Sequence, residues 1–156
     1  MTRRNLALPI LILSGLAVLL HGGCSITFNP TPNGGTEGKV TIRVVNNTSV
    51  DLDPQIFIAA SVLPRNELFQ QKYKYTDYGV FDEGLLGPYG SETFTLDCAD
   101  ARAVGTLGGK FNENGTVEKG DREYILTQEN VYFCGDVITF TYSRTSDGYT
   151  VNYDLN

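Results

Sequence analysis

The chain has 156 residues, a net charge of −6 and an apolar content of 41%, which suits one domain together with a targeting segment. An acidic chain repels phosphate backbones, so nucleic acid is excluded as a partner. The chain contains no tryptophan and a single histidine, His21.

Residues 1–23 have the order of a secretory signal peptide. Arg3 and Arg4 give a basic start, an almost unbroken apolar run covers residues 6–20, and Gly22 and Gly23 precede Cys24. The run is shorter than the roughly 20 apolar residues of a spanning helix. We therefore expect export, followed by cleavage of this signal helix before Cys24.

The segment LLHGGC around that cysteine resembles the lipobox of bacterial lipoproteins, with His21 where leucine usually stands. The resemblance implies that Cys24 carries lipid, including palmitate, and anchors the chain in the cell membrane or outer membrane. The folded part would then lie in the periplasm or at the cell surface. Ordinary secretion and an uncleaved N-terminal anchor are the alternatives.

Loss of residues 1–23, which contain two arginines and no acid, would change the net charge from −6 to −8 and remove the only histidine. Catalysis by Ser-His-Asp or Cys-His groups needs an imidazole, and catalytic zinc sites commonly use histidine ligands. We therefore expect neither an enzyme nor a bound cofactor.

Residues 24–38 are rich in Pro, Gly, Asn and Thr, which predicts a flexible tether, and residues 39–156 form the expected domain. Alternating apolar positions predict a strand over 39–45, and the turn formers of 46–54 end it. A short apolar strand follows at 55–60. Residues 65–74 favour two or three helical turns, and the alternation resumes over 91–98.

Three glycines loosen the apolar segment 102–111, which predicts a bent or bulged strand. Residues 112–121 read as a polar loop, and 122–128 and 130–134 as a strand with its continuation. The clearest element is a hairpin of 136–144 and 149–155 with Asp147-Gly148 at its turn. Short strands with glycine-rich turns predict an all-β, two-layer antiparallel β-sandwich, immunoglobulin-like or similar.

Cys98 and Cys134 remain as a pair if Cys24 is lipidated. Pairs of cysteines usually close in an oxidising compartment, so we expect a structural disulfide worth about 3–4 kcal/mol. A redox pair is the alternative, although the C-x-x-C spacing is missing.

Asp51 and Asp53 alternate like metal-binding carboxylates, and calcium prefers several such oxygens. A calcium-dependent binding module is therefore one alternative function, and ordinary turn residues are the other explanation of these acids. Paired carboxylates among Asp82, Glu83 and Glu118 would be needed for a histidine-free hydrolase.

Tyr73, Tyr75 and Tyr78 lie close together among charged residues. Exposed tyrosines are good anchors for a partner protein or a sugar ring, and equally suit the rim of a sandwich. They are the candidate partner surface.

The segments 38–59, 84–106 and 133–143 resemble a loosely defined group of bacterial lipoproteins that carry a short Asn/Thr/Gly tether and a small β domain. The resemblance implies no activity and transfers no catalytic residues. The expected function is an envelope-anchored lipoprotein whose non-catalytic β domain binds an envelope protein or glycan, or has a structural role.

Overall fold

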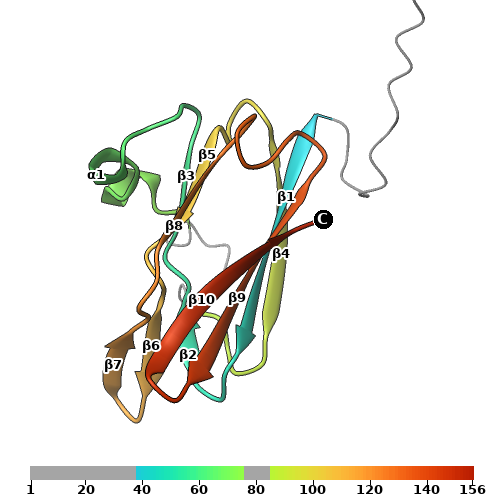
Figure 1. Cartoon of the computed structure of the whole chain (residues 1–156). Coiled ribbons are helices and arrows are strands. Elements are labelled where there is room, and N and C mark those ends of the chain that lie inside the picture. Colours follow the sequence, from blue (N-terminus) through green and yellow to red (C-terminus); the bar gives the residue numbers. More distant parts are fainter. Residues whose placement is uncertain (1–37, 76–84) are drawn as a thin grey trace, which may run out of the picture. The chain divides into compact units, whose positions relative to one another are not determined.

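The computed structural model describes residues 38–75 and 85–156, and strands account for most of them. One layer is a four-stranded sheet in the order β10-β9-β1-β4 (Figure 1). Its strands are β1 (Lys39–Asn47), β4 (Ser91–Asp97), β9 (Val137–Thr145) and β10 (Gly148–Leu155). The predicted all-β sandwich is confirmed, with one difference: β1 runs antiparallel to β4 but parallel to β9.

Alternation in the sequence places one side of this sheet in the core. On β1, Val40, Ile42 and Val44 are fully buried, while Arg43 on the other side is exposed. Cross-strand neighbours share a face, and the facing residues of β9 are apolar or aromatic. On β4, half-buried Leu96 and Phe94 continue this face, whereas Glu92, opposite Val44, is exposed. The predicted period-2 pattern of residues 39–45 is therefore confirmed.

Two three-stranded sheets form the second layer. One has the order β3-β5-β8 and the other β2-β6-β7. The strands are β2 (Asp51–Asp53), β3 (Ile56–Ala59), β5 (Ala103–Thr106), β6 (Lys110–Glu113), β7 (Thr116–Lys119) and β8 (Tyr124–Thr127). Three pairs of consecutive strands, β2 and β3, β5 and β6, and β7 and β8, each place one strand in each sheet. We call each pair one pass of the chain. The two sheets therefore amount to one antiparallel layer that is interrupted midway.

The interruption is a kink, formed by Pro54–Gln55, 107–109 and 120–123. Gln55, Gly108 and Gly109 all have positive φ, a backbone region that is costly for most residues and easy for glycine. At Gly108 an added Cβ would lie 2.7 Å from the backbone oxygen of Gly120, so the two passes touch there through backbone alone. This confirms the predicted bend in segment 102–111.

One tyrosine hydroxyl satisfies the backbone inside the kink. Tyr142 of β9 is fully buried, and its hydroxyl donates to the carbonyl oxygen of Pro54 and lies 2.8 Å from Oγ1 of Thr106. Oγ1 of Thr106 also bonds the Pro54 carbonyl, at 3.1 Å, and accepts from the N–H of Gly108 at 3.2 Å. The first layer thus supplies the polar group that the interrupted second layer needs.

A short helical segment covers the outer side of β3 and β5 (Figure 1). It contains α1 (Arg65–Leu68) and a 3-10 turn at Gln71–Tyr73, in agreement with the predicted helical turns. Leu68 is buried against Phe57, Ala59 and Ala103 in a second core cluster. No helix among residues 38–75 and 85–156 has the length and apolar character needed to cross a membrane.

Three expectations about secondary structure are wrong. β7 lies within the segment predicted as a polar loop, β2 lies among the predicted turn formers, and residues 130–134 form turns rather than a strand. β7 is exposed along its whole length, so its sequence carries no apolar alternation. Pairing with β6 holds it in place, and that pairing is not visible in its own residues.

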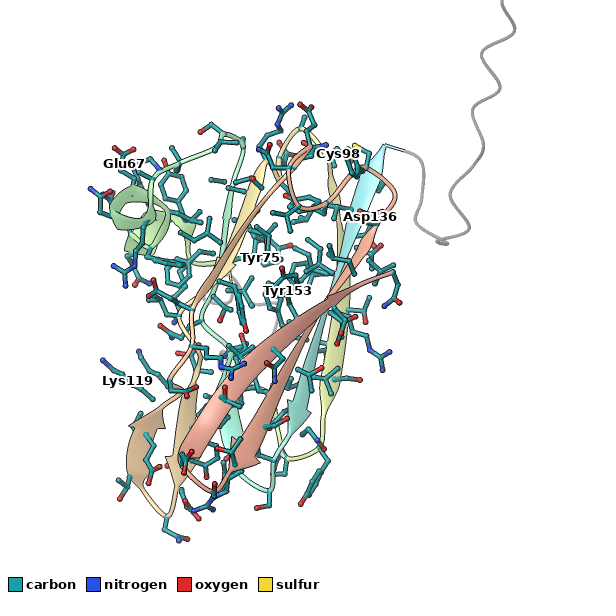
Figure 2. All side chains as sticks on the ribbon, in the orientation of Figure 1. Glu67, Tyr75, Cys98, Lys119, Asp136 and Tyr153 are labelled. Carbon is teal, nitrogen blue, oxygen red and sulfur yellow. A yellow bond between two sulfur atoms is a disulfide. The ribbon has the colours of Figure 1, made fainter. Side chains whose placement is uncertain are left out.

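Cys98 and Cys134 form a disulfide, as expected. Cys98 directly follows β4, and Cys134 precedes β9, so the bond joins the two strands that flank β1. Gly38 and Lys39 are held between them: the N–H of Cys98 donates to Gly38 O (3.1 Å) and that of Gly135 to Lys39 O (2.7 Å). We name this region, which includes Asp136, the cystine end; Figure 2 shows Cys98 and Asp136 there.

Replacing both Cys98 and Cys134 by serine is expected to lower the free energy of unfolding by about 3–4 kcal/mol, because the bond closes a loop with a sequence separation of 36. Urea unfolding of the double variant and the unaltered domain measures the difference. An equal stability for the oxidised domain and the double variant would contradict the structural role of this disulfide.

Alkaline pH is expected to destabilise the domain through two buried tyrosines. Burial raises the pKa of both Tyr132 and Tyr142 well above the ordinary value. The unfolded chain ionises them near pH 10 while the folded chain keeps them protonated. Stability is therefore complete below about pH 10 and falls above it, by about 1.4 kcal/mol per pH unit for each tyrosine.

Urea unfolding between pH 9 and 11 tests this dependence. Tyr142→Phe and Tyr132→Phe should each reduce the fall in unfolding free energy above pH 10 by about 1.4 kcal/mol per pH unit. The double variant should combine both reductions. A slope that both variants leave unchanged would show that other groups govern alkaline unfolding.

Candidate functional site

A buried asparagine organises the end of the sandwich opposite to the cystine end. Asn46, the penultimate residue of β1, has no exposed surface. Its Nδ2 donates to the carbonyl oxygens of Val50 (2.8 Å), Gly87 (2.9 Å) and Leu86 (3.1 Å). Its Oδ1 accepts from Oγ1 and N–H of Thr48, at 2.6 and 3.1 Å. One side chain thus ties two separate loops to the end of β1.

Four connections lie together at this end, which we name the loop end: 48–50, 86–90, 114–115 and 146–147. The register places them together, because Asn47 pairs with Ser143 and Asp51 with Asn112. They consist mostly of Gly, Ser, Thr and Asn, and carry a single charge, on Asp147. Figure 1 shows the β6–β7 and β9–β10 hairpins reaching this end side by side.

A charged network joins those two hairpins. Arg144 donates to Oε1 of Glu113 at 2.9 Å, and the hydroxyl of Tyr149 donates to Oε2 of Glu113 at 3.1 Å. These hydrogen bonds, that from Arg144 foremost, lower the pKa of Glu113 below its ordinary value, because they stabilise the charged carboxylate. The Tyr149 ring stacks on Phe111 with centroids 4.0 Å apart. The network fixes the hairpins relative to each other.

Tyr89 is the most exposed large apolar side chain of the described residues, at 72%. It follows Pro88 at the tip of loop 86–90, and its backbone φ is +55°. The loop that carries it is held by the contacts of Asn46. The loop end therefore combines a fixed scaffold with one protruding aromatic ring.

Asp53, a predicted calcium ligand, contacts two cations. Its Oδ2 lies 3.1 Å from Nζ of Lys74 and 3.9 Å from Nζ of Lys110. Its carboxylate also accepts from the N–H and side-chain amide of Gln55, the kink residue with positive φ. This arrangement gives Asp53 a structural role in holding the kink. Ammonium neighbours disfavour a second cation at the same carboxylate.

Asp51, the other predicted ligand, shares a face of β2 with Asp53 and is half-buried. Across residues 38–75 and 85–156, no three His, Cys, Asp or Glu side chains gather as a metal-binding group. Calcium binding stays an untested prediction. Of the acids considered for hydrolysis, Glu118 lies exposed on β7, whereas Asp82 and Glu83 lie outside the described residues.

The predicted tyrosine surface is not a cluster of exposed rings. Tyr73 is half-buried beside the second core cluster, and Nζ of Lys72 lies 4.7 Å above its ring. Tyr75, labelled in Figure 2, is half-buried. Its ring stacks on that of Phe94 of β4, with centroids 4.7 Å apart. Tyr78 lies outside the described residues, as does Cys24.

A shallow, open depression lies beside the cystine end. It is lined by Ala60, Ser61, Val62, Ala99 and Arg102. Arg102 carries an ion pair with Glu129 at 3.4 Å, so its charge already has a partner. The loop end offers the more distinctive arrangement of side chains.

Sequence reasoning missed Asn46 and Tyr89. Asn46 stands among turn formers, where a buried asparagine looks the same as an exposed one. The Gly-Pro-Tyr-Gly run predicts a turn, but the commonest turn with proline at its second position accepts tyrosine at the third. The positive φ of Tyr89 is therefore visible only in the structure.

Comparison of the chain with models of known protein families, and with curated proteins, finds no match.

Asn46→Ala is expected to lower the free energy of unfolding by about 3 kcal/mol, because it leaves buried carbonyl groups and the Thr48 N–H without partners. Urea unfolding measures the loss, and hydrogen exchange should accelerate in loops 48–50 and 86–90. The matched control is Asn47→Ala at the exposed neighbouring position, which should change stability by less than about 0.5 kcal/mol. Equal effects of the two variants would contradict the role assigned to Asn46.

Proposed function

We propose that this chain is an exported lipoprotein, anchored in the cell membrane or outer membrane by lipid on Cys24, and that its β-sandwich binds another component of the cell envelope. The proposed role is binding rather than catalysis. The mature chain would contain no imidazole, so catalysis by histidine is unavailable to it.

The observation that carries this proposal is the separation between the two ends of the sandwich. The chain enters the domain at Gly38, which is held at the cystine end. The four loops around Asn46 lie at the far end of β1, nine residues of extended strand away. A domain attached through its N-terminal side would leave these loops accessible to a partner.

The disulfide supports the expected compartment. Structural disulfides form and persist in exported proteins and are rare in the cytosol. Cys98 and Cys134 are joined within the domain, which leaves Cys24 as the third cysteine and the one available for lipid. This assignment agrees with the basic, apolar and small-residue order of residues 1–23.

The mass of the intact protein extracted from membranes of the cells that make it tests the anchor. We expect a chain that begins at Cys24, carries acyl chains on that residue and contains one disulfide. Cys24→Ser should release the protein from the membrane fraction, because one acyl anchor contributes about 0.8 kcal/mol per buried CH₂ group.

Ser25→Ala is the matched control, since it changes the adjacent position without removing the thiol, and it should remain with the membrane. Recovery of the unaltered chain in the soluble fraction with a free Cys24 thiol would rule out the lipid anchor.

A further inference from the structure

We propose that Pro88 and Tyr89 form the contact tip through which the loop end binds a partner protein. This inference rests on the proposed binding function and names the residues and the class of partner. The partner would offer an apolar pocket for the phenol ring, with a hydrogen-bond acceptor for its hydroxyl.

The backbone at Tyr89 is held in a conformation that tyrosine disfavours. The N–H of Gly90 donates to the carbonyl oxygen of Gly87 at 3.1 Å, which closes a four-residue turn with Pro88 and Tyr89 at its centre. A φ of +55° at the third residue is the region where glycine or asparagine is preferred. Residues held in such regions cluster at sites of function, where the side chain is needed.

The turn is fixed by its surroundings rather than by its own sequence. Its N-terminal part is bound by Nδ2 of Asn46, which contacts the carbonyl groups of Leu86 and Gly87. The N–H of Tyr89 donates to Thr48 O at 3.0 Å, and the N–H of Asn46 to Gly90 O at 2.9 Å. A Cβ at Gly90 would lie 2.9 Å from the Gly87 oxygen, so the turn also excludes larger residues there.

Such a turn presents the ring at a small entropic cost of binding. The backbone is already ordered, and tyrosine has only two side-chain torsions to fix. Val117 and Phe133 are also exposed, at 59% and 60%, but neither has a positive φ. Among the exposed apolar residues that the structure describes, Tyr89 alone combines exposure with an enforced backbone.

The composition of the loop end favours a protein as the partner. Tyrosine surrounded by serine, asparagine and glycine on rigid loops is the combination used by protein-binding paratopes, in which the ring anchors and small polar residues adapt. Tyr89 is a single ring without an aromatic neighbour in these loops, whereas a sugar-binding platform would present a wider aromatic surface. A glycan is therefore an outcome that the test must distinguish.

Tyr89→Asn separates binding from stability. Asparagine tolerates a positive φ, so we expect this variant to raise the Tm of the mature domain by about 2–4 °C while it removes the ring. Tyr89→Phe keeps the ring and should leave the Tm unchanged. A lower Tm for Tyr89→Asn would show that the ring serves the fold and would overturn the proposal.

Photocrosslinking in the cells that make the full chain tests the contact. A benzophenone amino acid replaces Tyr89, Val62 or Phe133 in turn. Val62 and Phe133 are the matched controls, because they are 55% and 60% exposed and lie outside the loop end. We expect one discrete protein adduct from position 89 and none from the controls. Excess purified domain should abolish this adduct, and the Tyr89→Asn domain should compete about 30-fold more weakly, as for the loss of a binding hot spot.

Three results would overturn the proposal: no adduct from position 89, equal adducts from all three positions, or equal competition by the Tyr89→Asn domain. An adduct with glycan or lipid would overturn the assignment to a protein partner. The anchor is judged separately, because a chain without lipid on Cys24 that still crosslinks through position 89 would end the anchoring proposal and leave this one standing.

Discussion

The hydrogen bonds of the Tyr142 hydroxyl inside the kink are the constraint on which the rest of the sandwich depends. The second layer changes direction midway, and a change of direction removes ladder partners from backbone groups that remain buried. Pro54 cannot donate, and its carbonyl oxygen accepts from Tyr142, with Oγ1 of Thr106 beside it. Because the tyrosine comes from the opposite layer, the bend and the spacing of the two layers are set together.

Asp53 holds the same kink from its other side through Gln55 and Lys74. Of the two acids that the sequence suggests as calcium ligands, Asp51 and Asp53, the second therefore has an architectural role.

The parts of this fold that follow from local pattern could be predicted, and the parts that depend on distant partners could not. Alternation predicted β1 and β9, which bury every second residue over most of their length, and β4, where Phe94 and Leu96 on one face are half-buried. Asp147-Gly148 predicted the turn between β9 and β10. The glycines at 108 and 109 indicated a bend in segment 102–111. β7 escaped prediction since all four of its residues are exposed and only the pairing with β6 orders it. The disulfide, at the opposite end from the candidate site, was predicted from the count of cysteines. The roles of Asn46 and Asp53 arise from contacts with residues 40 and 21 positions away along the chain.

The two ends of the sandwich are stabilised by different means. At the cystine end a covalent bond and backbone hydrogen bonds surround Gly38 and Lys39. At the loop end the same strand finishes in a buried amide that contacts two loops. When a buried amide loses a hydrogen-bond partner, water cannot replace it, so the loss is costly. The bonds of Asn46 therefore hold both loops in place. This order is what allows Tyr89 to occupy a backbone region that it disfavours. Loop 86–90 is therefore held in a geometry that its own sequence disfavours at Tyr89.

The position of β1 has a mechanical consequence. β1 lies between β4 and β9, with hydrogen bonds on both sides along most of its length, and the disulfide closes over the point where it starts. A force applied to Gly38 along the strand axis therefore loads the hydrogen bonds of both ladders in shear, all at once. The same force applied across the sheet would break these hydrogen bonds one after another, beginning beside the disulfide. A domain held by its N-terminal side and pulled from its loops would meet the load in its most resistant direction.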